Sequence, residues 1–256
     1  MAGFEAIDGN LRATLAVFGR ARPDGERCEL AGVAVASSAV QFSMFNSAAL
    51  TAPVASAREL DLRIATAGEF FGQRRLGWSF WVCQGWIGTG VRGVVADLFY
   101  RRGLHLVTEM PGMEAEALPP PARPLPRLEF RRVADAGTRG DFSYIMSTAF
   151  GLPPPVARDI YESESTWSAG LTGWVGYAAD VAVTTAATFA SASAVGVYAV
   201  GTPPPHRHKG YAEAVMRHAL GQARAGRSVL ESSEAGLLLY YALGYRSVTR
   251  YAVFAT

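Results

Sequence analysis

The chain has 256 residues and a formal net charge of +2, from 24 basic and 22 acidic residues. So small an excess gives no reason to expect a dedicated nucleic-acid binder or a polybasic membrane binder. Half of the residues are hydrophobic, which is enough for a sizeable core and excludes a disordered or fibrous chain. The length is compatible with one large domain or with two small ones.

Cysteine usage and hydropathy indicate a protein of a reducing compartment. The two cysteines, Cys28 and Cys83, are far apart and belong to no metal-binding or redox spacing. The most apolar stretch, residues 30–50, contains serine, glutamine and asparagine side chains that would be costly in hydrocarbon. Residues 1–20 carry charges and do not resemble a signal peptide. We therefore expect a cytoplasmic protein without membrane association.

A run of prolines divides the sequence near its middle. Five prolines lie between Pro119 and Pro126, and neither a helix nor a central strand tolerates such a run. The run predicts a stiff, extended segment, and domain borders often fall in segments of this kind. We expect a domain at 1–118, a linker at 119–127 and a second domain at 128–256. The alternative is a long surface loop within one domain.

The first half alternates between strand and helix signals. In chain order we expect a strand within 30–40, a helix within 53–73, a strand at 79–82, a helix at 91–101 and a strand at 104–108.

The second half shows a longer series of elements. Two helices are expected after the first strand, and three strands precede a long helix. The predicted elements are a strand at 128–132, helices at 141–150 and after Pro155, strands at 173–179, 181–189 and 194–201, a helix at 210–225, a strand at 228–231, a helix at 234–243 and a strand at 246–254. This order predicts an α/β fold (α+β) with helices around one mixed sheet.

The turn between the strand at 194–201 and the next helix has the character of an anion site. Three prolines end the strand, and Arg207, Lys209 and Gly210 precede the helix. The first amides of a helix have no intrahelical partner, and the helix dipole favours negative charge there. A phosphate or pyrophosphate is the natural ligand. The alternative is a solvated basic loop.

Two segments of the second half resemble the signatures of one enzyme superfamily. The motif Arg207-x-x-Gly210-x-Ala212 resembles the pyrophosphate-binding loop of the GNAT (Gcn5-related N-acetyltransferase) superfamily. Residues 229–248 are similar to its second signature, which consists of a strand, a polar cap, a helix with a tyrosine and then Leu-Gly-aromatic. The resemblance covers residues 128–256 and implies the acyl-CoA N-acyltransferase fold, with acetyl-CoA as co-substrate.

The resemblance also implies roles for individual residues. Tyr240 matches the tyrosine that protonates the departing thiolate, although its ring could instead serve packing alone, and Tyr241 beside it leaves the register open. Ser233 matches a residue that contacts the cofactor arm, and it could equally cap the next helix. The implied cofactor-binding residues are Val200, Gly201, Thr202, Arg207, His208, Lys209, Gly210, Tyr211, Ala212 and Ser233.

The sequence offers no obvious general base for an amine substrate. The strand at 194–201 contains no acidic residue. Glu162, Glu164, Asp180 and Glu231 are candidates, and none has a compelling position. We expect a water molecule, or the substrate's own deprotonation equilibrium, to serve instead.

Two other patterns are interpreted as structural. Residues 88–93 spell G-x-G-x-x-G, but an aromatic strand and an interrupted connection precede them, so a flexible loop is favoured over a dinucleotide site. The histidines have no acidic or cysteine partners at ligand spacing, so no metal is expected.

The order of elements in the first half is similar to that of tandem acyltransferases, and the copy is expected to be degenerate because the Arg-x-x-Gly-x-Ala loop is absent before residue 118. The alternative is an unrelated α/β cap.

The function implied is transfer of an acetyl group to a primary amine, on a small molecule or a peptide, by a monomer or homodimer. The alternatives are a non-catalytic coenzyme A binding or sensing module and a pure interaction protein.

Overall fold

The molecule is built on one mixed sheet that runs through both halves of the chain. A computed structural model describes residues 3–256. Within these residues, eleven strands form a single sheet in the order β1-β2-β3-β4-β11-β5-β10-β9-β8-β7-β6. The strands are β1 (Glu26–Leu30), β2 (Val33–Ser37), β3 (Asn46–Leu50), β4 (Ser79–Cys83), β5 (His105–Ala115), β6 (Glu129–Arg132), β7 (Thr172–Ala178), β8 (Val181–Ala190), β9 (Val195–Gly201), β10 (Ser228–Glu231) and β11 (Arg246–Ala255).

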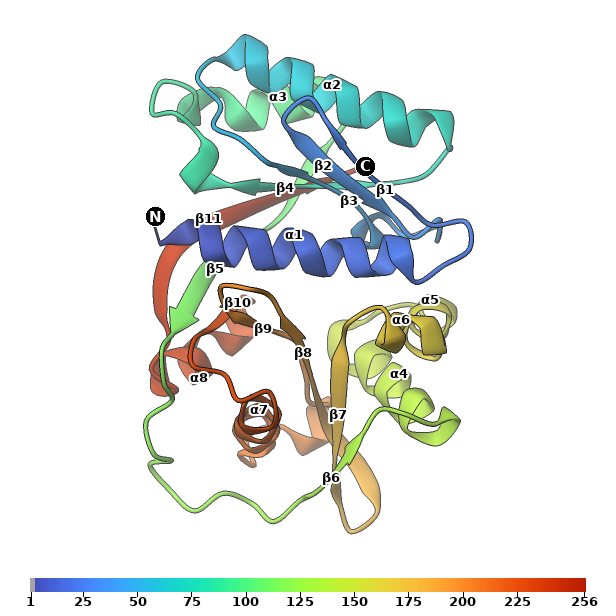
Figure 1. The fold of residues 1–256 in the computed structure, drawn as a ribbon, viewed down its shortest axis with the longest axis vertical. Coiled ribbons are helices and arrows are strands. Elements are labelled where there is room, and N and C mark those ends of the chain that lie inside the picture. Colours follow the sequence, from blue (N-terminus) through green and yellow to red (C-terminus); the bar gives the residue numbers. More distant parts are fainter. Residues whose placement is uncertain (1–2) are drawn as a thin grey trace.

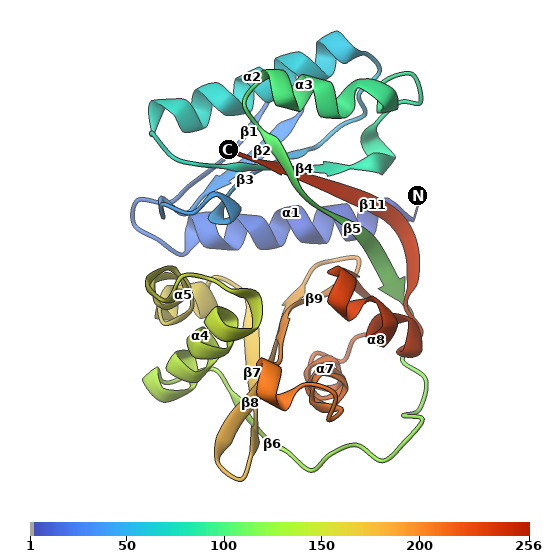
Figure 2. The same cartoon turned by 180° about the vertical axis from the view of Figure 1, so that it is seen from behind.

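Helices cover both faces of this sheet. They are α1 (Phe4–Arg20), α2 (Ala57–Gln73), α3 (Val95–Arg101), α4 (Ala136–Phe150), α5 (Pro154–Tyr161), α6 (Glu164–Ser168), α7 (Tyr211–Gln222) and α8 (Leu237–Ala242). In the first half, α2 and α3 lie on one face of the strands and α1 on the other (Figures 1 and 2). In the second half, α7 and α8 lie on the opposite side of β7 and β8 from α4, α5 and α6. Among residues 3–256, no helix combines the length and apolar character that a bilayer span needs.

The last strand of the chain lies inside the sheet of the first half. β11 pairs antiparallel with β4 on one side and with β5 on the other. Phe254 of β11 stacks on Phe99 of α3, with ring centroids 4.2 Å apart. The buried Glu114 of β5 pairs with Arg227 and Arg246. The first half therefore depends on the C-terminal residues to complete its core.

The first helix also joins the two halves. Asn10 of α1 is fully buried and donates hydrogen bonds to Phe189 O at 3.2 Å and to Ala194 O at 3.1 Å. Tyr198 of β9 donates its hydroxyl hydrogen to Asn10 Oδ1 at 2.6 Å. Gly196 permits this close approach, because a Cβ at that position would collide with Asn10 Oδ1. A buried amide with this many partners fixes α1 against the second half of the sheet.

Most predicted elements are confirmed, and the differences have local causes. Helix α4 begins at Ala136, earlier than expected, because Asp135 and Thr138 form a reciprocal capping box. Sequence analysis missed α1 and β3. The first predicted strand, within 30–40, corresponds to β2, and β1, which precedes it across a turn at Gly32 with φ +78°, was also missed.

The proline-rich segment connects β5, in the middle of the sheet, with β6 at its edge (Figure 1). Helix α1, from the first half, packs against the second half, and β11, from the second half, pairs with strands of the first. The two halves therefore share one sheet. The partition into 1–118 and 128–256 stays a prediction.

Candidate functional site

The candidate site lies where two parallel strands separate. β9 and β10 pair only at Val195 with Ser228 and at Gly196 with Val229. Beyond Gly196, the described residues of the two strands form no further pairs with each other. The open edge of β9 therefore leaves backbone groups without a strand partner. An extended ligand that carries amide groups can hydrogen-bond to such an edge.

A β-bulge in β9 accompanies this separation. On the neighbouring strand β8, Thr185 is opposite Gly201, whereas Ala187 is opposite Tyr198, so β9 contains one extra residue. Ala199, within the bulge, has φ +52°, and its carbonyl accepts a hydrogen bond from Thr185 Oγ1 at 3.0 Å. A bulge bends its strand and redirects the following side chains. Here it directs the end of β9 away from β10.

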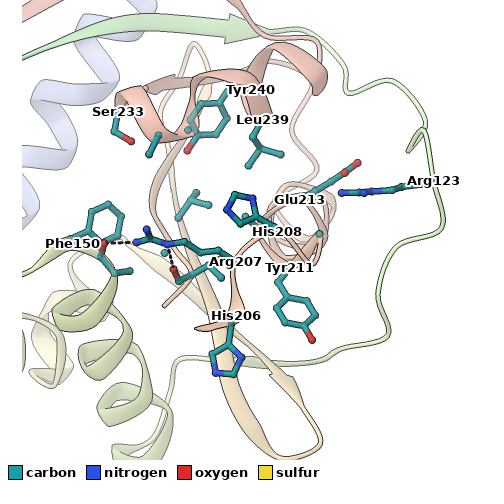
Figure 3. Close-up of a pocket in the computed structure, with 18 residues that line it drawn as sticks. Arg123, Phe150, His206, Arg207, His208, Tyr211, Glu213, Ser233, Leu239 and Tyr240 are labelled. Carbon is teal, nitrogen blue, oxygen red and sulfur yellow. Dashed lines mark hydrogen bonds between the residues drawn. The ribbon is translucent and has the colours of Figure 1, made fainter. Parts of the chain in front are cut away.

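A cavity of about 740 Å³ occupies this gap and extends to the start of α7 (Figure 3). Its size lies within the range of small-molecule sites. Its wall is formed by α4, the end of β9, the turn before α7, the start of α7, the segment from Ser233 through α8, and the linker. The lining residues are Arg123, Ala149, Phe150, Val200, Gly201, Thr202, His206, Arg207, His208, Gly210, Tyr211, Ala212, Glu213, Ser233, Ala235, Gly236, Leu239 and Tyr240.

The start of helix α7 presents unpaired amides to this cavity. Gly210 is the N-cap residue in the left-handed conformation, with φ +81°, and no side chain caps the helix. The first intrahelical bond runs from Ala214 N to Gly210 O at 3.1 Å. In the described chain, the amides of residues 211–213 donate no hydrogen bond. An anion would satisfy these donors.

Arg207 lies along the wall of the cavity between β9 and α4. Its Nε donates to Thr202 O at 3.1 Å and its Nη2 to Ala149 O at 3.4 Å (Figure 3). These bonds position the guanidinium beside the gap. Both Arg207 and Lys209 are exposed, but Lys209 is not among the lining residues. Apart from Lys209, every residue that the sequence suggested for the cofactor lines this cavity.

Tyr240 and Tyr241, the two tyrosines considered for the signature, have different surroundings. Tyr240 is 9% exposed, and its hydroxyl points into the cavity (Figure 3). Burial raises the pKa of Tyr240, and the nearby Tyr245 and Glu231 raise it further, so the phenol keeps its proton at neutral pH. Tyr241 is 49% exposed and shares a hydrogen bond with Ser247 outside the cavity.

Ser233 lies at the turn that leads into α8. It occupies the N-cap position of a short 3-10 turn, Glu234–Gly236, but its side chain makes no capping hydrogen bond. Its side chain faces the cavity instead (Figure 3). The side chain is therefore available to a ligand.

None of the four acids considered as a base lines the cavity. Glu162, Glu164 and Asp180 are exposed elsewhere on the second half. Glu231 is partly buried, and its Oε1 is shielded from solvent without a hydrogen-bond partner. Burial raises the pKa of Glu231 to about 8, with a smaller contribution from the negative charge of Asp8. Among residues 3–256, the single acid that lines the cavity is Glu213, which forms an ion pair with Arg217 at 2.9 Å.

Sequence reasoning missed the residues that tertiary folding or helix periodicity brings to the wall. Ala235 and Leu239, like Gly236 and Tyr240, are four positions apart, and that spacing could have identified this helix face. Arg123, Ala149 and Phe150 carried no such signal, because they reach the cavity from the linker and from α4.

Of the two patterns interpreted as structural, the G-x-G-x-x-G segment lies away from the cavity, whereas His206 and His208 line it. Residues 88–93 form the connection between a short 3-10 turn and α3 and line no part of the cavity. Over residues 3–256, no group of three or more His, Cys, Asp or Glu side chains has the arrangement of a metal site.

Comparisons with known proteins identify the fold. No family model and no curated protein matches the sequence. Among solved structures, the GCN5-related N-acetyltransferase from Kribbella flavida superposes with a TM-score of 0.68 at 17% identity, covering 96% of this chain and 95% of its own. The GCN5-related N-acetyltransferase from Sphaerobacter thermophilus gives 0.61 at 17% identity, with coverage of 88% and 76%.

A third structure bears on the arrangement of the two halves. The tandem GNAT protein from the clavulanic acid biosynthesis pathway superposes over 100% of this chain and 96% of its own, with a TM-score of 0.55 at 11% identity. Both halves of the chain therefore have counterparts in one tandem structure. The chain has the fold of the GCN5-related N-acetyltransferases, in a tandem arrangement that takes in both halves.

Proposed function

We propose that the protein is an N-acetyltransferase that moves an acetyl group from acetyl-CoA to a primary amine. The observation that carries the proposal is the cavity that joins the uncapped start of α7 to the open edge of β9. A fold shared with acetyltransferases raises this expectation, but a fold alone does not establish activity. The cavity supplies the specific chemistry.

The positions of the helix start and of the open strand edge favour one orientation of the cofactor. Its pyrophosphate lies on the amides of residues 211–213, where the helix dipole and Arg207 favour negative charge. Its amide-containing arm follows the edge of β9 at Val200–Thr202, as an added strand would. The thioester then lies in the gap between β9 and β10, near Tyr240.

The reaction is a direct transfer. The lone pair of the neutral amine attacks the thioester carbonyl, the C–S bond breaks, and the nitrogen loses a proton to water. The backbone amide of Val200 polarises the carbonyl oxygen. Tyr240 is protonated at neutral pH, because burial raises its pKa, so it donates a hydrogen bond and then a proton to the departing sulfur. Solvent reprotonates the phenolate.

One observation supports a second candidate, a coenzyme A binding or sensing module without catalysis. Within the described chain, Glu213 is the only acid on the cavity wall, and it lies at the start of α7 and not in the gap between the strands. A module that only binds coenzyme A needs no base.

Two measurements separate these functions. Isothermal titration calorimetry with acetyl-CoA is expected to show one binding site per chain, and absence of binding would refute both candidates. A thiol-release assay over small amines and N-terminal peptides, with mass detection of the acetylated amine, distinguishes an enzyme from a sensor. Binding without any acetylated product would favour the sensor. Size-exclusion chromatography then tests the expectation of a monomer or homodimer.

A further inference from the structure

The proline-rich linker lies against helix α7 or its N-cap residue at both of its ends. At one end, Pro119 O accepts a hydrogen bond from Arg217 Nη1 at 2.7 Å. At the other end, Pro126 Cδ would lie 3.3 Å from a Cβ placed on Gly210. Prolines also keep the intervening segment extended. The linker is thus a strap across the outside of α7, beside the helix start that the cofactor is proposed to bind.

The middle of this strap places one cation on the cavity wall. Arg123 lines the cavity, and its side chain extends toward Glu213 (Figure 3). No carboxylate of residues 3–256 lies within 4.0 Å of its guanidinium, since Glu213 pairs with Arg217 instead. Arg123 is exposed, so an incoming anion can reach its guanidinium.

Arg123 lies at a different end of the cavity from the acetyl-transfer chemistry. Figure 3 shows it on the side away from Ser233, beyond His208 and Glu213. Arg207 is already engaged with Thr202 O and Ala149 O beside the gap. The amides of α7 serve the pyrophosphate. A cation beyond that helix start can therefore contact a second phosphate group farther along the same ligand.

We propose that Arg123 binds the 3′-phosphate on the ribose of coenzyme A, so that the linker forms part of the cofactor site and selects coenzyme A over its 3′-dephospho form. This inference rests on the proposed function. 3′-dephospho-coenzyme A has a neutral hydroxyl in place of the 3′-phosphate monoester, so a guanidinium on this strap distinguishes the two ligands by charge.

The test is calorimetry with two ligands and three proteins. Coenzyme A and 3′-dephospho-coenzyme A are titrated into the wild type, Arg123→Ala and Arg127→Ala. Arg127→Ala is the matched control, because it removes the same charge from the next arginine along the chain, which is exposed and does not line the cavity. Thermal denaturation of each variant verifies that the fold is retained.

Arg123→Ala is expected to weaken binding of coenzyme A by about tenfold or more, which corresponds to one lost charge-assisted hydrogen bond. Its affinity for the dephospho form should equal that of the wild type, as should both affinities of Arg127→Ala. An equal loss for both ligands, or no loss for either, would overturn the assignment to the 3′-phosphate. If the wild type binds neither ligand, the proposed function itself fails, which is a different result.

Discussion

The two halves contain the same strand–helix–strand crossover, and only one of the two crossovers leaves room for a ligand. β3, α2 and β4 form the first, and β9, α7 and β10 form the second, each with its strands in parallel. In the first half the strand pairing extends past the strand ends through a bridge between Val54 and Ile87. Val54 N donates to Trp86 O at 2.8 Å, and Gly88 N donates to Val54 O at 2.9 Å. These bonds close the gap that stays open in the second half.

The helix starts differ in the same way. At α2, Ser56 Oγ accepts from Glu59 N at 3.2 Å, and Glu59 Oε2 accepts from Ala55 N at 2.8 Å. The helix therefore caps itself, and it places a carboxylate where an anion would otherwise bind. Arg63 adds hydrogen bonds to the carbonyls of Ala52 and Pro53. At α7, Gly210 provides no side-chain cap. A shared fold becomes a binding site where backbone donors are left unpaired.

The largest expected effect comes from placing negative charge at the start of α7 in the second crossover. The double variant Arg207→Glu, Gly210→Asp is expected to weaken acetyl-CoA binding by at least about a hundredfold, because it places two carboxylates against the pyrophosphate. Gly210 also has φ +81°, where an L side chain is strained. Calorimetry measures the loss. The control is Arg75→Glu, a charge reversal in the first half. An unchanged affinity in the double variant would place the cofactor elsewhere.

Removing the Tyr240 hydroxyl, which reaches the cavity of the open crossover from α8, should affect the reaction and not binding. Tyr240→Phe is expected to slow thiol release by roughly tenfold to a hundredfold, since the sulfur loses its proton donor. Cofactor affinity should stay at the wild-type value. Tyr241→Phe, which changes the exposed neighbour, is the matched control. If the two variants react equally fast, Tyr240 is a packing residue.

The carboxyl of Glu231, whose Oε1 is shielded from solvent, predicts that the stability of the fold depends on pH. The pKa of Glu231 is raised from 4.5 to about 8, so the folded chain binds this proton more tightly than the unfolded chain. Its contribution to stability therefore falls as pH rises from about 4.5 to about 8. Glu231→Gln should remove this loss and raise Tm at pH 9 relative to the wild type, by roughly 2–4 °C per kcal/mol.

Thermal scans between pH 5 and pH 9 measure this difference. Glu234→Gln, an exposed carboxyl on the following turn, is the control and should leave the pH profile unchanged. A difference in Tm between Glu231→Gln and wild type that does not grow with pH would contradict the prediction.

The smallest effect is expected at the capped helix of the first half. Ser56→Ala should lower the free energy of unfolding by about 1 kcal/mol, through loss of the N-cap hydrogen bond. The stoichiometry of acetyl-CoA binding should remain one per chain, because the Val54–Ile87 bridge still closes the gap. Chemical denaturation and calorimetry measure the two quantities. A second binding site would show that the cap alone blocks the first half.

Local patterns in the sequence were sufficient for most elements of the second half and for the residues around Gly210. The apolar run of β9, the prolines after it and the helical spacing of α7 are short-range features, so they could be interpreted without the fold. Helix α1 was missed because it begins without a capping side chain and contains two glycines, so its local helix signals are weak. β3 was missed because its serine and alanine residues resemble loop composition.

The sequence by itself determined the type and order of these elements, and it was enough to predict an anion site in the loop before α7 and to suggest Tyr240 as a candidate proton donor. Only the tertiary structure decided that β11 lies between β4 and β5, that the first crossover is closed, and that Arg123 reaches the cavity. The physical reason is distance along the chain. Strand partners, bridges and linker paths depend on contacts between residues far apart in sequence, and no local pattern encodes them.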